Sequence, residues 1–240
     1  MSRQIAYMVS EFPSISETFI LREIAALRDI GFDVQVFALR RPRGSRTHRM
    51  AGPLAGNVHY PPPLASPRLV GSQADFLRRS FREYREAFSE ALQWPERPPP
   101  SSPRKIRHFL TAVHFAAQAR ALQVSHVHAH FAYVTADVAR TMARLLGTTF
   151  SVSAHAWDIY RTDPRELDQR LKDAAFVVTC SHFNRREILI RAPALEEKRL
   201  HVLHHDHSRR RGLEDFHRQA AGDELRDLPH SLGAGFSDNS

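Results

Sequence analysis

The sequence contains a single cysteine, Cys180, and only three lysines among its 34 basic residues. One cysteine cannot form a disulfide within the chain, which excludes a disulfide scaffold and favours a reducing compartment. No apolar run approaches the roughly 18–20 residues that a membrane-spanning helix needs. The apolar stretch at residues 5–9 is also too short for a signal peptide. We therefore expect a cytosolic protein.

Glycine is scarce as well, at ten of 240 residues, and none lies in the loop that follows the first apolar stretch. This absence excludes the glycine-rich dinucleotide fingerprint and the Walker phosphate loop at that position. Hydrophobic residues make up 42% of the chain and charged residues 25%. Such a balance is typical of a protein that folds around an apolar core.

The formal net charge of +8 is concentrated in one segment of the chain. Residues 40–107 hold 14 Lys and Arg against five Asp and Glu, whereas the remainder holds 20 against 21. A basic segment can serve nucleic acid, an anionic membrane surface or an acidic ligand. The preference for Arg fits either codon composition or bidentate recognition of phosphate and carboxylate. Composition alone leaves these alternatives open.

Short apolar runs alternate with segments of helical periodicity, which predicts an α/β fold with a Rossmann-like, doubly wound parallel sheet. Strands are expected at residues 5–9, 34–39, 58–60, 124–131, 149–154, 175–179 and 200–203. Helices are expected at residues 19–27, 77–92, 106–117, 136–146, from Asp163 onward, and at 182–190. Asp163, Gly147 and Ser181 are typical capping residues.

The segment 77–92 is predicted to form one basic amphipathic helix. Its apolar face comprises Leu77, Phe81, Tyr84, Phe88 and Leu92, and its basic face Arg78, Arg79, Arg82 and Arg85. The basic face fits either peripheral contact with a membrane or an ordinary solvated surface. In the next helix, the expected inner stripe is Ile106, Leu110, Val113 and Ala117.

Ligands of open parallel sheets bind beyond the carboxyl ends of the strands, and polar residues follow several of the predicted strands. The first such loop contains Glu17 and Thr18 and leads into a helix N-terminus, which favours an anion. Glu17 could equally serve only to favour the helix dipole.

A second strand end carries His126, His128 and His130, whose spacing of two places the imidazoles on one face. A metal site is one interpretation, but no fourth ligand with motif spacing is evident, and we expect no metal. The alternative is histidines held by hydrogen bonds, with one lining a cleft. His126 lies furthest from the strand end and is expected to be a bystander.

A third strand end delivers His155, with Asp158 three residues later. A histidine that titrates near neutrality can exchange a proton with a substrate hydroxyl, and Asp158 could orient it or bind sugar hydroxyls. At the fourth strand end, Ser181 is interpreted as an N-cap and Cys180 as a packed thiol.

Four motifs in order resemble those of family 4 glycosyltransferases, which build bacterial polysaccharides. They are the segment 12–19 (FPSISETF), 128–131 (HAHF), 153–160 (SAHAWDIY) and 178–181 (VTCS). The resemblance covers about residues 3 to 204. It implies the N-terminal, acceptor-binding half of the two-domain GT-B fold, transfer of a hexose from a nucleotide sugar with retention, and no essential metal or cofactor.

The resemblance also assigns roles to residues. His155 is implied to be catalytic, in contact with the transferred sugar. The acceptor is implied to be a glycan or a lipid-linked acceptor. Because the sequence shows no recognised DNA-binding or RNA-binding motif, we expect no nucleic acid partner. Residues expected to bind substrate are Glu17, Thr18, His128, His130 and Asp158.

After residue 204 the sequence departs from the family pattern, and residues 205–240 are expected to be an atypical, disordered tail. The family's pair of glutamates eight positions apart, which serves the nucleotide sugar, does not occur. We expect a chain that lacks the donor domain through a change of reading frame near residue 205. Translation of the downstream DNA in the other frames tests this. The alternatives are a non-catalytic half-module that binds an acceptor or partner and, ranked last, a nucleic-acid binder.

Overall fold

The computed structural model describes residues 3–14, 18–42, 56–94 and 102–203. Its strands form one seven-stranded sheet in the order β3-β2-β1-β4-β5-β6-β7, and every neighbouring pair is parallel. The strands are β1 (Arg3–Glu11), β2 (Phe32–Arg40), β3 (Val58–His59), β4 (His126–His130), β5 (Thr149–Ala154), β6 (Val177–Thr179) and β7 (Leu200–Val202). The prediction of a doubly wound parallel α/β sheet is confirmed.

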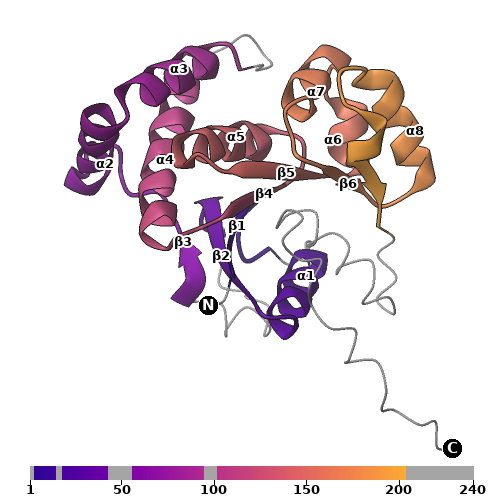
Figure 1. Ribbon diagram of the computed structural model, residues 1–240, viewed down its shortest axis with the longest axis horizontal. Coiled ribbons are helices and arrows are strands. Elements are labelled where there is room, and N and C mark those ends of the chain that lie inside the picture. The colour runs from indigo at the N-terminus through magenta and orange to yellow at the C-terminus, as the bar shows by residue number, and fades with distance from the viewer. Residues whose placement is uncertain (1–2, 15–17, 43–55, 95–101, 204–240) are drawn as a thin grey trace, which may run out of the picture.

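The helices lie on both faces of this sheet. They are α1 (Thr18–Asp29), α2 (Pro67–Arg79), α3 (Phe81–Leu92), α4 (Ser102–Ala121), α5 (Val134–Leu146), α6 (Ala156–Arg161), α7 (Pro164–Leu171) and α8 (His182–Arg191). Figure 1 shows α1 on one side and α4 and α5 on the other. The strand order reverses between β1 and β4, which creates a crevice at their carboxyl ends.

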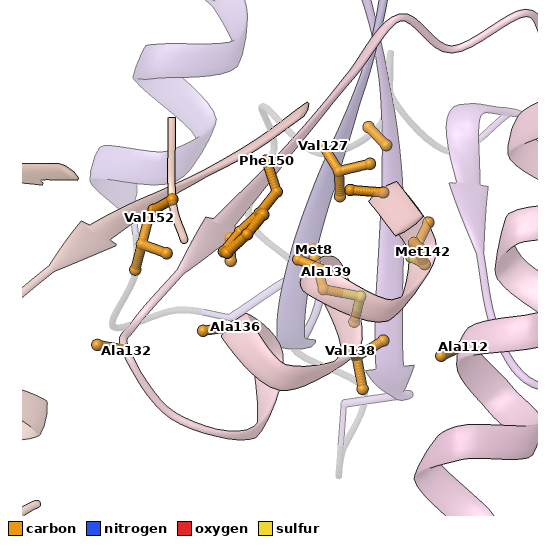
Figure 2. Close-up of a cluster of buried hydrophobic side chains, with 14 of the residues drawn as sticks. Met8, Ala112, Val127, Ala132, Ala136, Val138, Ala139, Met142, Phe150 and Val152 are labelled. Carbon is orange, nitrogen blue, oxygen red and sulfur yellow. The ribbon is translucent and has the colours of Figure 1, made fainter. Parts of the chain in front are cut away.

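Two buried clusters flank the sheet because successive side chains of a strand point to opposite faces. Met8 of β1 packs with residues of α5 and β5, including Met142 and Phe150 (Figure 2). Its neighbour Tyr7 points the other way and packs with Ile24 and Leu27 of α1. Tyr7 thereby places a hydroxyl group within the apolar layer between the sheet and α1.

The predicted helix caps are confirmed. Asp163 Oδ1 accepts a hydrogen bond from Arg165 N at 3.0 Å, and Ser181 Oγ accepts one from Asn184 N at 3.1 Å. Gly147 ends α5 with a φ of 68°, a left-handed conformation that glycine adopts without a Cβ clash.

The single helix predicted over residues 77–92 is wrong. The chain leaves helical geometry at Ser80, where φ is −144° and ψ is 50°, so that α2 ends and α3 begins. The buried residue is Phe76, whereas Leu77 is 41% exposed. The apolar residues keep their helical spacing across Ser80, and such spacing cannot show where one helix ends and the next begins in a new direction.

The inner stripe expected for α4 is confirmed at three of its four positions. Val113 is buried, and Leu110 and Ala117 pack against the core, whereas Ile106 is 38% exposed. The segment 156–161, expected as a loop, is the short helix α6. Within the described ranges, no helix is both long and apolar enough to cross a membrane. The expected tail at residues 205–240 lies outside those ranges.

Candidate functional site

The crevice at the strand order reversal gathers residues from two strand ends and from α1. His130 is the last residue of β4, and His155 follows β5 immediately. Their imidazole rings stack with centroids 6.1 Å apart and planes 14° apart. Phe19 of α1 packs against both, at 5.9 Å from His130 and 5.0 Å from His155. The fold therefore brings together two of the predicted site residues.

Phe131 joins this group through an unusual backbone conformation. Its φ is 71°, which is rare for a side chain with a Cβ, and its N–H donates to Ser153 O at 2.8 Å. This conformation places the Phe131 ring 4.9 Å from the His155 ring. Strained residues of this kind cluster at functional sites.

A half-buried carboxylate, Glu23 of α1, lies beside the histidines. Tyr7 Oη donates to Glu23 Oε1 at 2.5 Å, and Glu23 Oε2 lies 3.5 Å from His130 Nε2. His128 Nε2 lies 4.0 Å from Glu23 Oε1. Burial raises the pKa of the Glu23 carboxyl to about 7, and the hydrogen bond from Tyr7 partly offsets that rise.

Glu23 was not predicted from the sequence, although its position along α1 carried a signal. Ile20, Ile24 and Leu27 mark the buried face of α1, and Glu23 falls on that face at helical spacing. A carboxylate among buried positions is rarely tolerated without partners. That placement could have marked Glu23 as a polar group directed at the sheet.

Among the described residues, one group of three side chains could hold a metal ion: Glu23, His128 and His130, with ligand atoms within 4.8 Å of one another. Both ring nitrogens of His128 also face serine hydroxyls. Nδ1 lies 2.8 Å from Ser151 Oγ and Nε2 lies 3.0 Å from Ser153 Oγ. These two hydrogen bonds orient the His128 imidazole without a metal ion.

His126 is held in the same manner, further from the crevice. Its ring nitrogens lie 2.8 Å from Thr149 Oγ1 and 2.7 Å from Ser151 Oγ, and its ring stacks on Phe176. Burial lowers the pKa of His126 to about 4. These contacts agree with the interpretation of His126 as a structural residue.

Asp158 is fully buried, and its carboxylate binds backbone groups. Oδ1 accepts from His155 N at 2.9 Å, and Oδ2 accepts from Ala132 N at 2.6 Å. Burial raises the pKa of Asp158 to about 6, against the opposing effect of those hydrogen bonds. Asp158 thus ties the start of α6 to the loop after β4 and fixes the backbone of His155.

The remaining predicted residues lie as follows. Thr18 is the first residue of α1 and is half-buried, whereas Glu17 lies outside the described residues. Cys180 is half-buried, and its Sγ accepts a hydrogen bond from Asn184 Nδ2 at 3.4 Å. A small cavity of about 30 Å³ is lined by Glu23, Ser153, His155, Val178, Thr179, Cys180 and Leu203.

Phe131 also lines a larger groove of about 590 Å³, which we call the basic groove. Its walls combine side chains from the ends of β1, β2 and β4 with residues of α4, α5 and α6, and several of them are cationic or aromatic. They are Ser10, Leu39, Arg40, Arg104, Arg107, His108, Phe131, Tyr133, Val134 and Trp157. Its volume falls in the range of about 300–1,000 Å³ typical of small-molecule sites.

No family model and no curated protein matches the sequence. Similar solved structures include a glycosyltransferase from Rickettsia africae (12% identity, TM-score 0.47) and a UDP-N-acetylglucosamine 2-epimerase from Rickettsia bellii (8%, 0.46). A third is UGT2 of Phytolacca americana, in complex with UDP-2fluoro-glucose and pterostilbene (13%, 0.41). The similarities cover 84–85% of this chain but only 43%, 44% and 52% of those chains. The chain thus spans about half their length, and its own residues carry the functional proposal that follows.

Proposed function

We propose that this chain is the acceptor-binding half of a glycosyltransferase-type protein with a GT-B layout, acting in polysaccharide biosynthesis. The observation that carries the proposal is the crevice itself. Phe131 contacts His155 and lines a groove of small-molecule size, at the edge of the sheet where such folds bind ligands. The four motifs that resemble family 4 glycosyltransferases supply the reaction class.

In this proposal, His155 contacts the transferred hexose. During transfer, the acceptor oxygen bonds to the anomeric carbon while the bond from that carbon to the leaving phosphate breaks. The proton of the acceptor hydroxyl passes to the leaving phosphate oxygen. A hydrogen bond from the imidazole of His155 to the sugar would hold the anomeric carbon in position for this exchange.

We further propose that His130, His128 and Thr18, together with Glu17 of the preceding loop, bind the substrate on the acceptor side. Glu23 and Asp158 act through these residues. The Glu23 carboxylate adjoins His130, and Asp158 holds the backbone of His155. Asp158 is fully buried, so direct contact between its carboxylate and a sugar, the role first expected, would require the chain around it to open.

The proposed partner is a glycan or lipid-linked acceptor, and a nucleotide sugar binds only when a donor-binding half is supplied. Peripheral membrane contact through Arg78, Arg79, Arg82 and Arg85 remains part of the proposal. Arg79 pairs with Asp75 at 2.6 Å and Arg82 with Glu86 at 3.1 Å, which reduces the charge offered to a membrane. Co-sedimentation with anionic vesicles, compared with neutral ones, tests that contact.

Saturation-transfer NMR with a panel of short oligosaccharides tests the central proposal. We expect the chain alone to bind at least one of them, and we expect no turnover of nucleotide sugars by the chain alone. Absence of binding at millimolar sugar, together with absence of transfer when a donor-binding half is added, would contradict an acceptor half. Binding without transfer under those conditions would favour the non-catalytic half-module.

A further inference from the structure

We infer that the basic groove binds the phosphate or diphosphate group of a phosphorylated acceptor, and that Tyr133 and Trp157 form the platform for its adjoining sugar. This inference rests on the proposed function and names the substrate class of the same site. Of the lining residues, only Phe131 and Trp157 fall within the four motifs, and the groove is assembled from the ends of three strands and from three helices.

The first observation is an excess of positive charge in the groove. Arg104 and Arg107 lie three residues apart in the first two turns of α4, on its exposed side. Arg40 is already paired with Glu11 at 2.8 Å, but the described residues offer no ion-pair partner to Arg104 or Arg107. Among its described lining residues none is acidic. Two guanidinium groups in this setting suit an anion with several oxygens, and phosphate fits their planar donors bidentately.

The second observation is a polar atom in the groove wall that lacks a partner. His108 Nδ1 is buried and has no hydrogen-bond partner among the described residues. Burial, together with the charges of Arg107 and Arg104, lowers the pKa of His108 to about 4. The imidazole is therefore neutral at neutral pH and can donate one hydrogen bond to a bound oxygen. A buried nitrogen without a partner is costly, and rotation of the His108 ring toward the groove that it lines would let a ligand oxygen satisfy it.

The third observation is an exposed aromatic pair that lines the same groove as the cations. Trp157 is 52% exposed and Tyr133 39% exposed, and their rings meet edge to face at 5.7 Å. Arg170 lies 5.2 Å from the Tyr133 ring centroid and Arg161 lies 5.7 Å from the Trp157 centroid, which holds both rings in place. Large aromatic faces beside water are typical of binding sites, and the C–H face of a sugar stacks on them.

The geometry links the groove to the reacting group. Phe131 lines the groove on one side and contacts His155 on the other. An acceptor anchored by its phosphate at Arg104 and Arg107 would therefore extend its sugar past Tyr133 toward His155. The anchor and the reaction centre are separate in this arrangement, so that each can be tested alone.

Isothermal titration with inorganic pyrophosphate is the decisive measurement. In the double variant Arg104→Ala/Arg107→Ala, we expect the Kd to rise about tenfold or more, because charge-assisted hydrogen bonds are lost. The matched control is Arg165→Ala/Arg186→Ala, which removes the same charge from exposed positions on α7 and α8. We expect less than a twofold change there. Equal weakening in both variants, or none in the first, overturns the inference.

Three further ligands identify the source of the phosphate. Glucose 1-phosphate should bind more tightly than glucose, and Trp157→Ala should remove the advantage of glucose 1-phosphate over phosphate. Geranyl diphosphate that binds more tightly than pyrophosphate would indicate a lipid-linked acceptor, and equal affinity a soluble one. A single-stranded oligonucleotide that binds the groove more tightly than all of these would overturn the inference in favour of nucleic acid.

The two proposals can fail separately. If pyrophosphate binds the groove but no sugar is ever transferred with a donor-binding half present, the glycosyltransferase proposal fails and the anion site stands. If transfer occurs and the Arg104→Ala/Arg107→Ala variant transfers at the unaltered rate, the anion site fails and the proposed function stands.

Discussion

Among single residues, Glu23 combines burial, a pKa near neutrality and contact with Tyr7 and His130. Its protonation state around pH 7 determines whether His130 faces a carboxylate or a carboxylic acid. A group of this kind can make ligand binding at the crevice depend on pH, because the charge beside the imidazole changes in the physiological range.

Replacement of Glu23 by Gln should remove a titration near pH 7 from the pH profile of oligosaccharide binding. In Tyr7→Phe, the same titration should move upward, because the hydrogen bond from Tyr7 lowers the pKa of Glu23. Binding measured by NMR between pH 5.5 and 8.5 gives both profiles. An unchanged profile in both variants would show that Glu23 does not communicate with the site.

Replacement of His155 by Ala should lower transfer, measured with the donor-binding half supplied, by about 100-fold or more. The fold should persist, because His155 is a half-buried residue at the edge of the sheet. His201→Ala is the matched control, since His201 is half-buried on β7 and outside the cluster. A rate within twofold of the parent would exclude His155 from the reaction centre.

Chelation with EDTA should leave transfer unaffected. Serine hydroxyls lie within 3.0 Å of both ring nitrogens of His128, so the imidazole is oriented without an ion. Elemental analysis of the purified chain measures the number of metal ions bound per chain. Activity that falls on chelation, returns with Zn²⁺ or Mn²⁺ and disappears in His130→Ala would instead establish Glu23, His128 and His130 as metal ligands.

At the scale of secondary structure elements, the sequence predicts the start of α7 but not that of α6. Asp163 followed by Pro164 is a strong helix start, and α7 begins there as predicted. The six-residue helix α6 has no such signal, because its N-cap position is His155 and its stabilising acid, Asp158, lies inside the helix. The amphipathic pattern across Ser80 likewise gave no indication of the break between α2 and α3.

Two acids at neighbouring helix starts should differ in their contribution to stability. Asp163→Ala removes an exposed cap and should cost about 1 kcal/mol. Asp158→Ala leaves two backbone N–H groups without their acceptor in a buried setting and should cost about 2–4 kcal/mol. Urea unfolding followed by circular dichroism measures both. Equal costs would mean that water replaces the Asp158 carboxylate.

At the scale of the whole molecule, buried titratable groups make stability depend on pH in opposite directions. The pKa of His126 is about 4 in the folded chain, below its ordinary value of about 6.5. As the pH falls through 6.5, the unfolded chain therefore binds a proton first, and folding weakens until about pH 4. Glu23, with its raised pKa, contributes the reverse, and its stabilising effect is lost as the pH rises toward 7.

The contribution of His126 can be isolated with His126→Gln. Between pH 7.5 and pH 5, the parent should lose about 2 kcal/mol more stability than the variant. Free energies of unfolding from urea titrations at several pH values provide the comparison. If the free energy of unfolding falls equally in the parent and the variant, the pKa of His126 is not lowered in the folded chain.

The sequence by itself determined the fold class, the caps of α5, α7 and α8, and the strand ends that carry His130 and His155. These properties follow from local patterns, namely apolar periodicity, capping chemistry and residues adjacent along the chain. The approach of Glu23 to the histidines and the joining of Arg104, Arg107, Tyr133 and Trp157 in one groove were decided by the tertiary structure alone. Those residues come from separate elements, and only the strand order, which reverses between β1 and β4, places them at the same edge of the sheet.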